Sequence, residues 1–588
     1  MDAASKGGLE RWNGMLRKSG LPVSSKILAL MLLACLSTIT YGQASGGIYP
    51  DAVYYDAEVI TVNPNFTISQ AFAVLGDKFV AIGSNAAMLA LAGPHTKRVD
   101  LHHHAVIPGL IDDHYHYLNN AGTDFKEVSL VRATSFEQFL SIIKQRADEM
   151  PPGEVMSTQS GWLPDQFNGR LPNKEDLDKA APRNPLFVRG GHTMYLNTAA
   201  LKLAGITRGT PNPPGGVIGK DPKTGDVTGE LIDNAMGLVS KFLPRATDQD
   251  KLDGLRRAQK LLNSVGLTSV RDPGVGPSDI RIYQQLWDRD EMTVRVSTNL
   301  SLPSGPPASE ILAKLSEWGV HTRFGDTMLR LDGIGEFGMD GGFQAALMTR
   351  PYKDSPDVGP HVGPFYGVQR IPTDKFTQVI RGLNKLGWRA CVHAVGDRAV
   401  DIVLDAYEKA NEDSSIVGKR WTIEHGMVIR PDQMERIKKL GVIVSSQFHT
   451  YMASRTMIQD WGEKRGAEAN QTRQLLDAGI HVGVGTDWTL MPPNPFEVLY
   501  FLVTRKNRYG EPAGLDQRIS RREALRLATM GNAYITFEEN VKGSIEPGKL
   551  ADFVVLDRDY LTIPAEEIKD IRVLMTVVGG KVVFQKRT

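Results

Sequence analysis

Short apolar strands alternate with helical stretches through the middle of the chain, and this alternation constrains the fold more than any other feature of the sequence. The predicted strands are residues 268–271, 390–393, 422–424, 442–445 and 481–484. The predicted helices are residues 136–149, 252–265, 376–386 and 400–411. Strands that alternate with helices are typical of a parallel sheet with crossover helices, so we expect an α/β fold.

Several of these predicted strands end in a polar or ionisable residue. Asp272 follows the segment TSVR, His393 follows ACV, His425 follows TIE, and Asp487 follows VGVGT. In a (β/α)8 barrel, the active site is built at the carboxyl ends of the parallel strands. The pattern therefore predicts a TIM-type barrel whose functional groups lie at one end.

The two ends of the chain differ in composition from its middle, because they are rich in Val, Ile, Tyr and Phe between turn residues. The segments predicted as strands are residues 52–61, 71–82, 550–556, 573–578 and 581–584, with a hairpin turn at Gly579-Gly580. Residues 150–230 are dense in Pro, Gly, Asn and Asp, and we expect them to form an extended insertion that carries loops.

The N-terminal segment has the order of a signal peptide. Lys26 precedes the apolar run Ile27–Leu36, and Gly42 and Ala44 supply small residues before a cleavage point. The run has about ten apolar residues, fewer than the roughly 20 that a membrane span requires. We therefore expect residues 1–44 to be removed, and the mature protein to be exported to the periplasm or secreted.

Two alternatives remain open for this segment. One is an uncleaved amphipathic N-terminus. The other is lipoprotein processing at Cys35, because Leu32-Leu33-Ala34-Cys35 resembles a lipobox. A start at Met15 instead of Met1 would give the signal peptide a normal length.

Composition excludes several functional classes. The net charge is +1 and there is no dense basic stripe, so nothing in the charge supports nucleic-acid binding. The chain has only two cysteines, Cys35 and Cys391, which excludes a disulfide framework and a Cys-rich zinc module. A metal site would have to use His, Asp and Glu, and the 13 histidines allow this.

The segment PGLIDDHYH, residues 108–116, is the most informative motif. His114 and His116 stand two residues apart, and alternate residues of a strand point the same way, so both imidazoles can face one ion. Neutral imidazole is a good ligand for zinc and similar divalent metals. A pair of this kind also occurs by chance at a surface, so it does not establish a site alone. The run His102–His104 reads as a polar loop.

With its companion segments, this motif resembles the strand-one motif of the amidohydrolase superfamily. The companions are GLTSVRDPG, CVHAVGDRAVD, TIEHG, VGVGTDW and KGSIEPGKLADFVVLDRD, in that order. The chain resembles the family-3 branch, which includes N-substituted formamide deformylases, from about residue 50 to the end. The resemblance implies a metal-dependent hydrolase barrel with a small β-sandwich formed by both chain ends.

The resemblance also assigns the metal ligands. They are His114 and His116 from strand one, His393 from strand five, His425 from strand six and Asp487 from strand eight. Many relatives carry a lysine where this chain has Glu336, and a glutamate supplies a carboxylate ligand directly. The register there is ambiguous, because Arg330 or Asp332 could be matched instead. We expect one or two divalent ions, with zinc the leading candidate.

The expected domain organisation has four parts. Residues 1–44 are the signal peptide, residues 45–107 and 543–588 form the β-sandwich, and residues 108–542 form the barrel with its insertion at about 150–230.

The expected reaction is hydrolysis of an amide, N-acyl or N-formyl C–N bond by metal-activated water. Asp487 is the expected base, His393 an aid to carbonyl polarisation, and His192 a substrate contact. A lactone, ester or carbamate substrate is the alternative, and a non-catalytic binding protein is a third hypothesis. We expect a small-molecule partner, no nucleic acid and no stable membrane span after processing, and leave a homodimer open.

Overall fold

The computed structural model describes residues 48–122, 127–130, 133–162, 164–190, 192–353, 364–487 and 494–586. The chain divides into two compact units, residues 1–49 and residues 50–588, and the helices and strands named below all belong to the second. The predicted signal peptide, with its alternative at Cys35, lies outside the described residues. Among the residues described, no helix combines the length and the apolar character that crossing a membrane requires.

Eight parallel strands form the central sheet, in the order β18-β17-β16-β15-β14-β13-β12-β6. They are β6 (Leu110–Asp112), β12 (Leu267–Val275), β13 (Arg295–Leu300), β14 (Leu329–Gly338), β15 (Ala390–Ala394), β16 (Thr422–His425), β17 (Ile443–Gln447) and β18 (Val482–Gly485). The first and last strands approach each other, because the N–H of Asp113 donates to the Val484 carbonyl. The sheet is thus a nearly closed barrel, and the predicted (β/α)8 fold is confirmed.

The two strands at the barrel seam are joined by a side chain as well. Asp112, at the end of β6, accepts hydrogen bonds from the backbone N–H of Thr486 at 3.1 Å and from its hydroxyl at 2.6 Å. The N–H of Asp487 in turn donates to the carbonyl of His114 at 2.8 Å. These contacts bring the residues that follow β6 next to those that follow β18.

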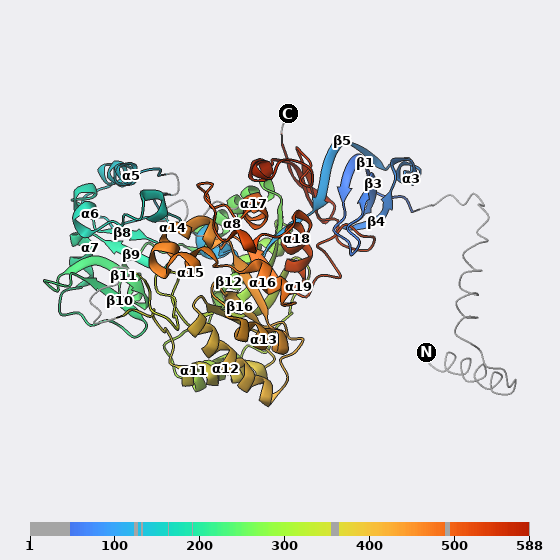
Figure 1. Ribbon diagram of the computed structural model, residues 1–588. Coiled ribbons are helices and arrows are strands. Elements are labelled where there is room, and N and C mark those ends of the chain that lie inside the picture. Colours follow the sequence, from blue (N-terminus) through green and yellow to red (C-terminus); the bar gives the residue numbers. More distant parts are fainter. Residues whose placement is uncertain are drawn as a thin grey trace, which may run out of the picture. The chain divides into compact units, whose positions relative to one another are not determined.

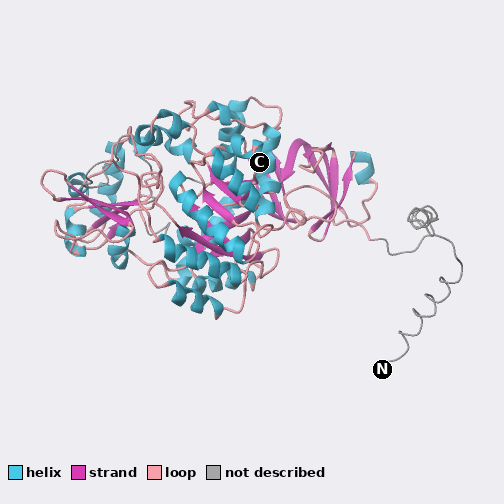
Figure 2. Ribbon diagram, turned by 60° about the horizontal axis from the view of Figure 1, so that its bottom comes forward, coloured by secondary structure: helices cyan, strands magenta, loops and turns pink. Residues whose placement is uncertain are grey.

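Helices lie around the central strands (Figure 2), and along the chain a helix follows most of the barrel strands. They include α8 (Asp248–Ser264), α9 (Ile280–Trp287), α10 (Ala308–Ser316), α11 (Thr373–Lys385), α12 (Asp397–Asp413) and α13 (Pro431–Leu440). Helix α8 illustrates why they form where they do. It begins with a capping box between Thr247 and Asp250, and it buries Leu252, Leu255 and Leu262 on one face.

Strands from both chain ends join in one further sheet of eight strands (Figure 1). They are β1 (Ala52–Ile60), β2 (Ile68–Ser69), β3 (Ala71–Leu75), β4 (Lys78–Gly83), β5 (Lys97–Pro108), β19 (Phe553–Leu556), β20 (Val573–Val578) and β21 (Lys581–Gln585). Strand β19 pairs antiparallel with β5, which confirms that the two ends fold together. At the predicted hairpin, Gly579 and Gly580 have φ of 53° and 75°, as a tight turn of this hand requires.

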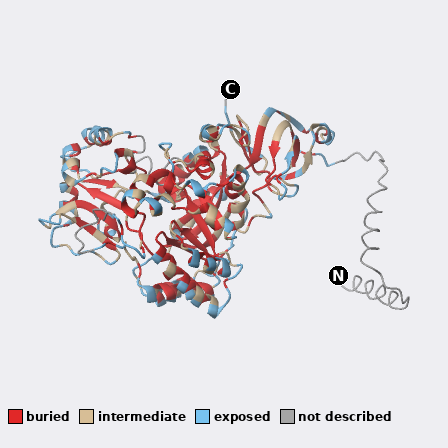
Figure 3. Ribbon diagram, in the orientation of Figure 1, coloured by how far each residue is buried: buried red, intermediate tan, exposed pale blue. Residues whose placement is uncertain are grey.

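The insertion contains more regular structure than the sequence predicts. It forms a five-stranded sheet from β7 (Met156–Ser157), β8 (Leu186–Arg189), β9 (Thr193–Leu196), β10 (Gly216–Lys220) and β11 (Val227–Asp233). Most of β8 and β9 is buried (Figure 3), and α5 (Phe136–Glu149) packs into the same apolar cluster. The expectation of loops was therefore incomplete, because strands of two to seven residues between Gly and Pro turns leave little periodicity to detect.

Candidate metal centre

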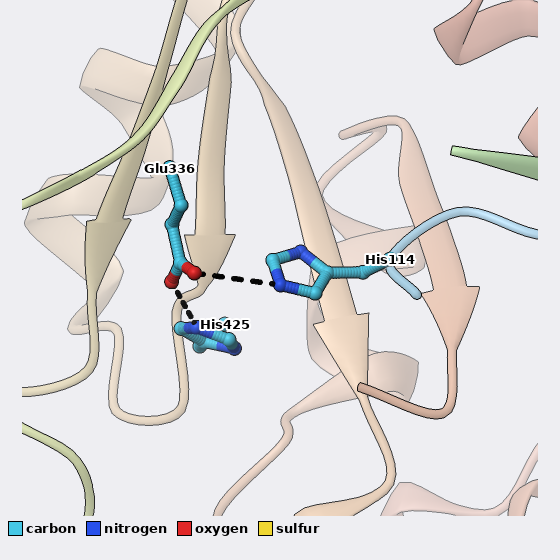
Figure 4. Close-up of side chains that lie close together, drawn as sticks. All are labelled: His114, Glu336 and His425. Atoms are coloured by element: carbon cyan, nitrogen blue, oxygen red, sulfur yellow. Dashed lines mark hydrogen bonds and ion pairs between the residues drawn. The ribbon is translucent and has the colours of Figure 1, made fainter. Parts of the chain in front are cut away.

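Glu336, near the end of β14, lies at the centre of a cluster of imidazoles (Figure 4). Its Oε1 is 2.7 Å from Nε2 of His425, and the same oxygen contacts Nδ1 of His393. Its Oε2 is 3.7 Å from Nε2 of His114 and 3.7 Å from Nε2 of His116. One carboxylate therefore faces four of the predicted ligands.

Asp487 forms the second acidic group of the cluster. Its Oδ1 is 3.2 Å from Nε2 of His116 and 3.8 Å from Nε2 of His114. Its Oδ2 lies on the other side, 2.9 Å from Nε2 of His449. The two carboxylates, Glu336 and Asp487, thus share the imidazoles of His114 and His116 as neighbours.

The barrel topology explains why residues so distant in sequence meet. His425 is the last residue of β16, His114 follows β6 by two residues, and Asp487 follows β18 by two residues. Glu336 and His393 lie within the last three residues of β14 and β15. All are at the carboxyl ends of parallel strands, the edge at which a barrel of this type places its functional groups.

The donor set fits a divalent cation. Ligand atoms lie within 4.8 Å of one another in three groups: His114 with Glu336 and His425, His114 with His116 and Asp487, and His425 with His449 and Asp487. Nε2 of His114 is buried and has no hydrogen-bond partner among the described residues, so its lone pair is available to an ion. Imidazole and carboxylate are the ligands that zinc and similar ions take in proteins.

The electrostatics of the cluster reflect opposite charges held close together. Burial raises the pKa of Glu336, but the imidazoles of His393 and His425 outweigh burial and hold it well below its usual value. The pKa of Asp487 is lowered in the same way by its histidine neighbours. Burial lowers the pKa of His114, but the carboxylates of Glu336 and Glu424 raise it well above its usual value. The carboxylates are therefore ionised, and a bound cation would replace protons on the imidazoles.

A supporting layer fixes which nitrogen of each imidazole faces the cluster. Oε2 of Glu424 lies 2.9 Å from Nδ1 of His114, so the proton of that ring belongs on Nδ1 and its Nε2 faces inward. The Gln447 amide oxygen lies 2.6 Å from Nδ1 of His425 and has the same effect. Buried Arg271 donates to both oxygens of Glu424, at 2.6 and 3.0 Å, and keeps that carboxylate charged and in place.

His393 differs from the other predicted ligands because it belongs to none of the three groups. Its Nδ1 contacts Glu336, and its Nε2 lies 3.3 Å from the carbonyl of Gly341. Burial lowers the pKa of His393 to about 4. Both neighbours of the ring, the carboxylate of Glu336 and the carbonyl of Gly341, are hydrogen-bond acceptors. To act as a ligand through Nδ1, His393 would have to give up the proton that faces Glu336.

His192 reaches the cluster from the insertion. It precedes β9, its Nδ1 lies 2.8 Å from Oδ1 of Asp233, and its ring centroid is 5.2 Å from that of His393. It lines a pocket with members of the cluster and with Trp162 and Phe343. The structure thus places the predicted substrate contact at the mouth of the candidate metal centre.

The three residues that could be matched in the segment around Glu336 lie in different surroundings. Asp332 accepts from Arg271 at 2.6 Å and from Arg389 at 2.7 Å, and Arg330 pairs with Glu538. Neither Arg330 nor Asp332 belongs to the three groups of candidate ligands. Of the residues that could be matched in this segment, Glu336 is the one that faces the imidazoles.

Three residues of the cluster and its surroundings were not predicted from the sequence: His449, Glu424 and Gln447. His449 begins α14 (His449–Trp461), two residues after β17 ends in the polar run Ser445-Ser446-Gln447. A polar strand end was the signal that singled out His393, His425 and Asp487. Applied to residues 442–449, it would also have pointed to this turn.

Comparison with known proteins identifies the family. A family model described as "Amidohydrolase family" matches residues 97–584. The chain is 28% identical to the Protein LONG AFTER FAR-RED 3 of Arabidopsis thaliana, over 96% of this chain and 98% of that protein. It is also 28% identical to an N-substituted formamide deformylase of Arthrobacter pascens, over 91% of this chain and 98% of that protein. Among solved structures, an uncharacterised metal-dependent hydrolase from Pyrococcus furiosus is 27% identical, with a TM-score of 0.64 over 87% of this chain and all of that one.

Proposed function

Because the chain belongs to the amidohydrolase family, we propose that it hydrolyses a carbon–nitrogen bond in an amide, N-acyl or N-formyl small molecule. Family membership and the cluster of ligand groups support a hydrolase that uses a divalent metal. The observation that carries the proposal is the convergence of two ionised carboxylates, Glu336 and Asp487, on imidazoles at the barrel's strand ends. The similarity to an N-substituted formamide deformylase supports the choice of bond.

We propose that the ion is zinc and that the six predicted ligands hold it, as one ion or two. These residues are His114, His116, Glu336, His393, His425 and Asp487. When bound, such an ion supplies a Lewis acid and lowers the pKa of a coordinated water molecule. Glu336 has an oxygen on each side, one toward His393 and His425 and one toward His114 and His116, so it fits a ligand shared between two positions.

In this proposal, the chain's own residues move the proton and place the substrate. Asp487 is ionised and faces the pocket, so it accepts the proton of the attacking water and passes it to the leaving nitrogen. His192, held by Asp233, contacts the substrate from the insertion side. The aromatic rings of Trp162 and Phe343 form an apolar part of the pocket wall.

Chromogenic substrates test the choice of bond. The zinc-loaded protein would be incubated with 4-nitroformanilide, 4-nitroacetanilide and 4-nitrophenyl acetate, with Asp487→Asn as the inactive control. We expect release of 4-nitroaniline from at least one anilide by the wild type and much slower release by the variant. Turnover of the ester alone would move the assignment to the alternative bond type. No turnover of any probe, with zinc bound, would count against the proposed function.

Export is a separate proposal that rests on the N-terminal segment alone. The basic residues before Ile27–Leu36 and the small residues Gly42 and Ala44 support cleavage after residue 44. N-terminal sequencing of protein from the native host should give a chain that begins near Ser45. A cytoplasmic protein that keeps residues 1–44 would contradict export.

A further inference from the structure

The turn that follows β17 brings a histidine to the proposed base. His449, the first residue of α14, is 7% exposed, and its Nε2 lies 2.9 Å from Oδ2 of Asp487. The other oxygen of Asp487 lies 3.2 Å from Nε2 of His116. The contact with His449 therefore determines which carboxylate oxygen faces the metal ligands.

The direction of this hydrogen bond follows from what the partner can accept. An ionised carboxylate only accepts hydrogen bonds, so the proton of the contact resides on Nε2 of His449. Nδ1 is buried and has no hydrogen-bond partner among the described residues. Nε2 is therefore the nitrogen through which His449 holds Asp487.

The Nε2–H of His449 is directed to Asp487, so it is not available to a substrate carbonyl even though the ring lines the pocket. Because His449 also stands in one group of candidate ligand atoms, with His425 and Asp487, the zinc content of its variants has to be measured along with kcat.

The backbone that carries His449 is held firmly. The next residue, Thr450, donates from its N–H and its hydroxyl to the side-chain oxygen of Asn470, at 3.2 and 2.7 Å. Further along α14, Asp165 of the insertion accepts from the N–H groups of Arg455 and Thr456, both at 3.1 Å. These contacts fix both parts of a helix that departs from helical geometry at Ala453.

We propose that His449 is a positioning residue, which donates from Nε2 to Asp487 and holds the base in its working orientation. This inference rests on the proposed function, in which Asp487 accepts the proton of the attacking water. His449 acts through Asp487 and contacts neither the substrate carbonyl nor the ion.

Two amide substitutions separate the hydrogen bond from the bulk of the ring. The side-chain N–H of glutamine reaches the position of Nε2, whereas that of asparagine reaches only as far as Nδ1. In the zinc-loaded protein with 4-nitroformanilide, His449→Asn should lower kcat by about 10–100-fold, with KM changed less than about twofold. His449→Gln should stay within about fivefold of wild type. His481→Gln, in a histidine that stacks on Tyr534 outside the pocket, is the matched control.

Three results would overturn the proposal: wild-type kcat in His449→Asn, an equal loss in both amide variants, or loss of zinc from His449→Asn. Loss of zinc would make His449 a ligand. Thermal midpoints of both variants exclude unfolding as the cause.

A spectroscopic measurement decides the geometry even if no probe is hydrolysed. In ¹⁵N-histidine-labelled, zinc-loaded protein, NMR should show one exchange-protected Nε2–H imidazole proton that disappears in His449→Gln and shifts in Asp487→Asn. Assignment of His449 as the Nδ1–H tautomer would contradict the inference. Absence of hydrolysis by the wild type, with this signal present, would count against the proposed function and leave the contact established.

Discussion

Oε1 of Glu336 lies 2.7 Å from Nε2 of His425, so a carboxylate of β14 faces an imidazole of β16 across the intervening strand. His393, on that intervening strand β15, contacts the same oxygen. The other oxygen faces His114 and His116 at 3.7 Å. A single carboxylate thus links imidazoles from three barrel strands, and we expect metal binding to be sensitive to its loss.

The primary effect of Glu336→Gln should be a lower zinc stoichiometry or a lower zinc affinity. The amide keeps the shape but removes the negative charge that faces His393 and His425, and a neutral oxygen is a weaker ligand. Metal analysis after dialysis should show the loss, and added zinc should restore part of the activity. Glu511→Gln, in an ion pair with Arg455, is the control. Unchanged metal content and unchanged kcat in Glu336→Gln would show that Glu336 is not a ligand.

Asp487→Asn should separate catalysis from metal binding. It retains an oxygen near His116 but loses the proton acceptor. General acid–base catalysis contributes about 10²–10⁴-fold, so kcat should fall by at least that factor while the histidine ligands retain zinc. Steady-state kinetics on 4-nitroformanilide, with zinc measured on the same sample, check both parts. A variant with near-normal kcat would refute the base assignment and leave the metal site standing.

Glu424→Gln should destabilise the barrel. Glu424 is fully buried and accepts from Arg271 and from Nδ1 of His114, so the substitution leaves a buried guanidinium only partly compensated. Breaking a buried ion pair costs about 3–5 kcal/mol of unfolding free energy. Urea unfolding followed by circular dichroism measures this loss. Asp226→Asn, which breaks an exposed pair with Arg208, should leave the urea midpoint unchanged, and an equal effect in both variants would contradict the argument.

Zinc binding to the metal-free protein near neutral pH should release protons. Burial lowers the pKa of His116 and of His425, but Asp487 and Glu336, respectively, outweigh it and raise both above the usual value. Histidine ligands must lose their protons to bind an ion, so affinity should rise with pH through the upper range of these titrations. Calorimetry in buffers of different ionisation enthalpy measures the protons released. A heat of zinc binding that is the same in all buffers would contradict these protonation states.

The sequence predicted the barrel because its signal is local. Strands such as 390–393 and 422–424 are short apolar runs that end in a polar residue, and each appears in the structure within a residue or two of its expected bounds. The joining of both chain ends was implied by the resemblance to the amidohydrolase superfamily. The two ends join through the pairing of β5 with β19, which lie more than 400 residues apart in the chain. Local periodicity does not reveal a pairing over such a separation.

The supporting contacts of the site could not be predicted in this way. Glu424 on β16 contacts Arg271 on β12, and three strands separate these two in the sheet, so only the curvature of the barrel brings the side chains together. The dependence of His192 on Asp233 requires the five-stranded sheet of the insertion, which the sequence showed only as turns. His449 was within reach of the strand-end rule, but its contact with Asp487 was not, because the two residues follow different strands.

The central claim is that the chain is a metal-dependent hydrolase whose ion is held by the histidines and carboxylates at the strand ends. The most direct test is to remove metal with dipicolinate, confirm its loss by elemental analysis, and follow 4-nitroformanilide hydrolysis before and after zinc is restored. The account predicts that activity disappears with the metal, returns in proportion to the zinc bound, and does not return in His114→Ala or His425→Ala. Full hydrolysis by the metal-free protein, or full zinc occupancy in both variants, would contradict it.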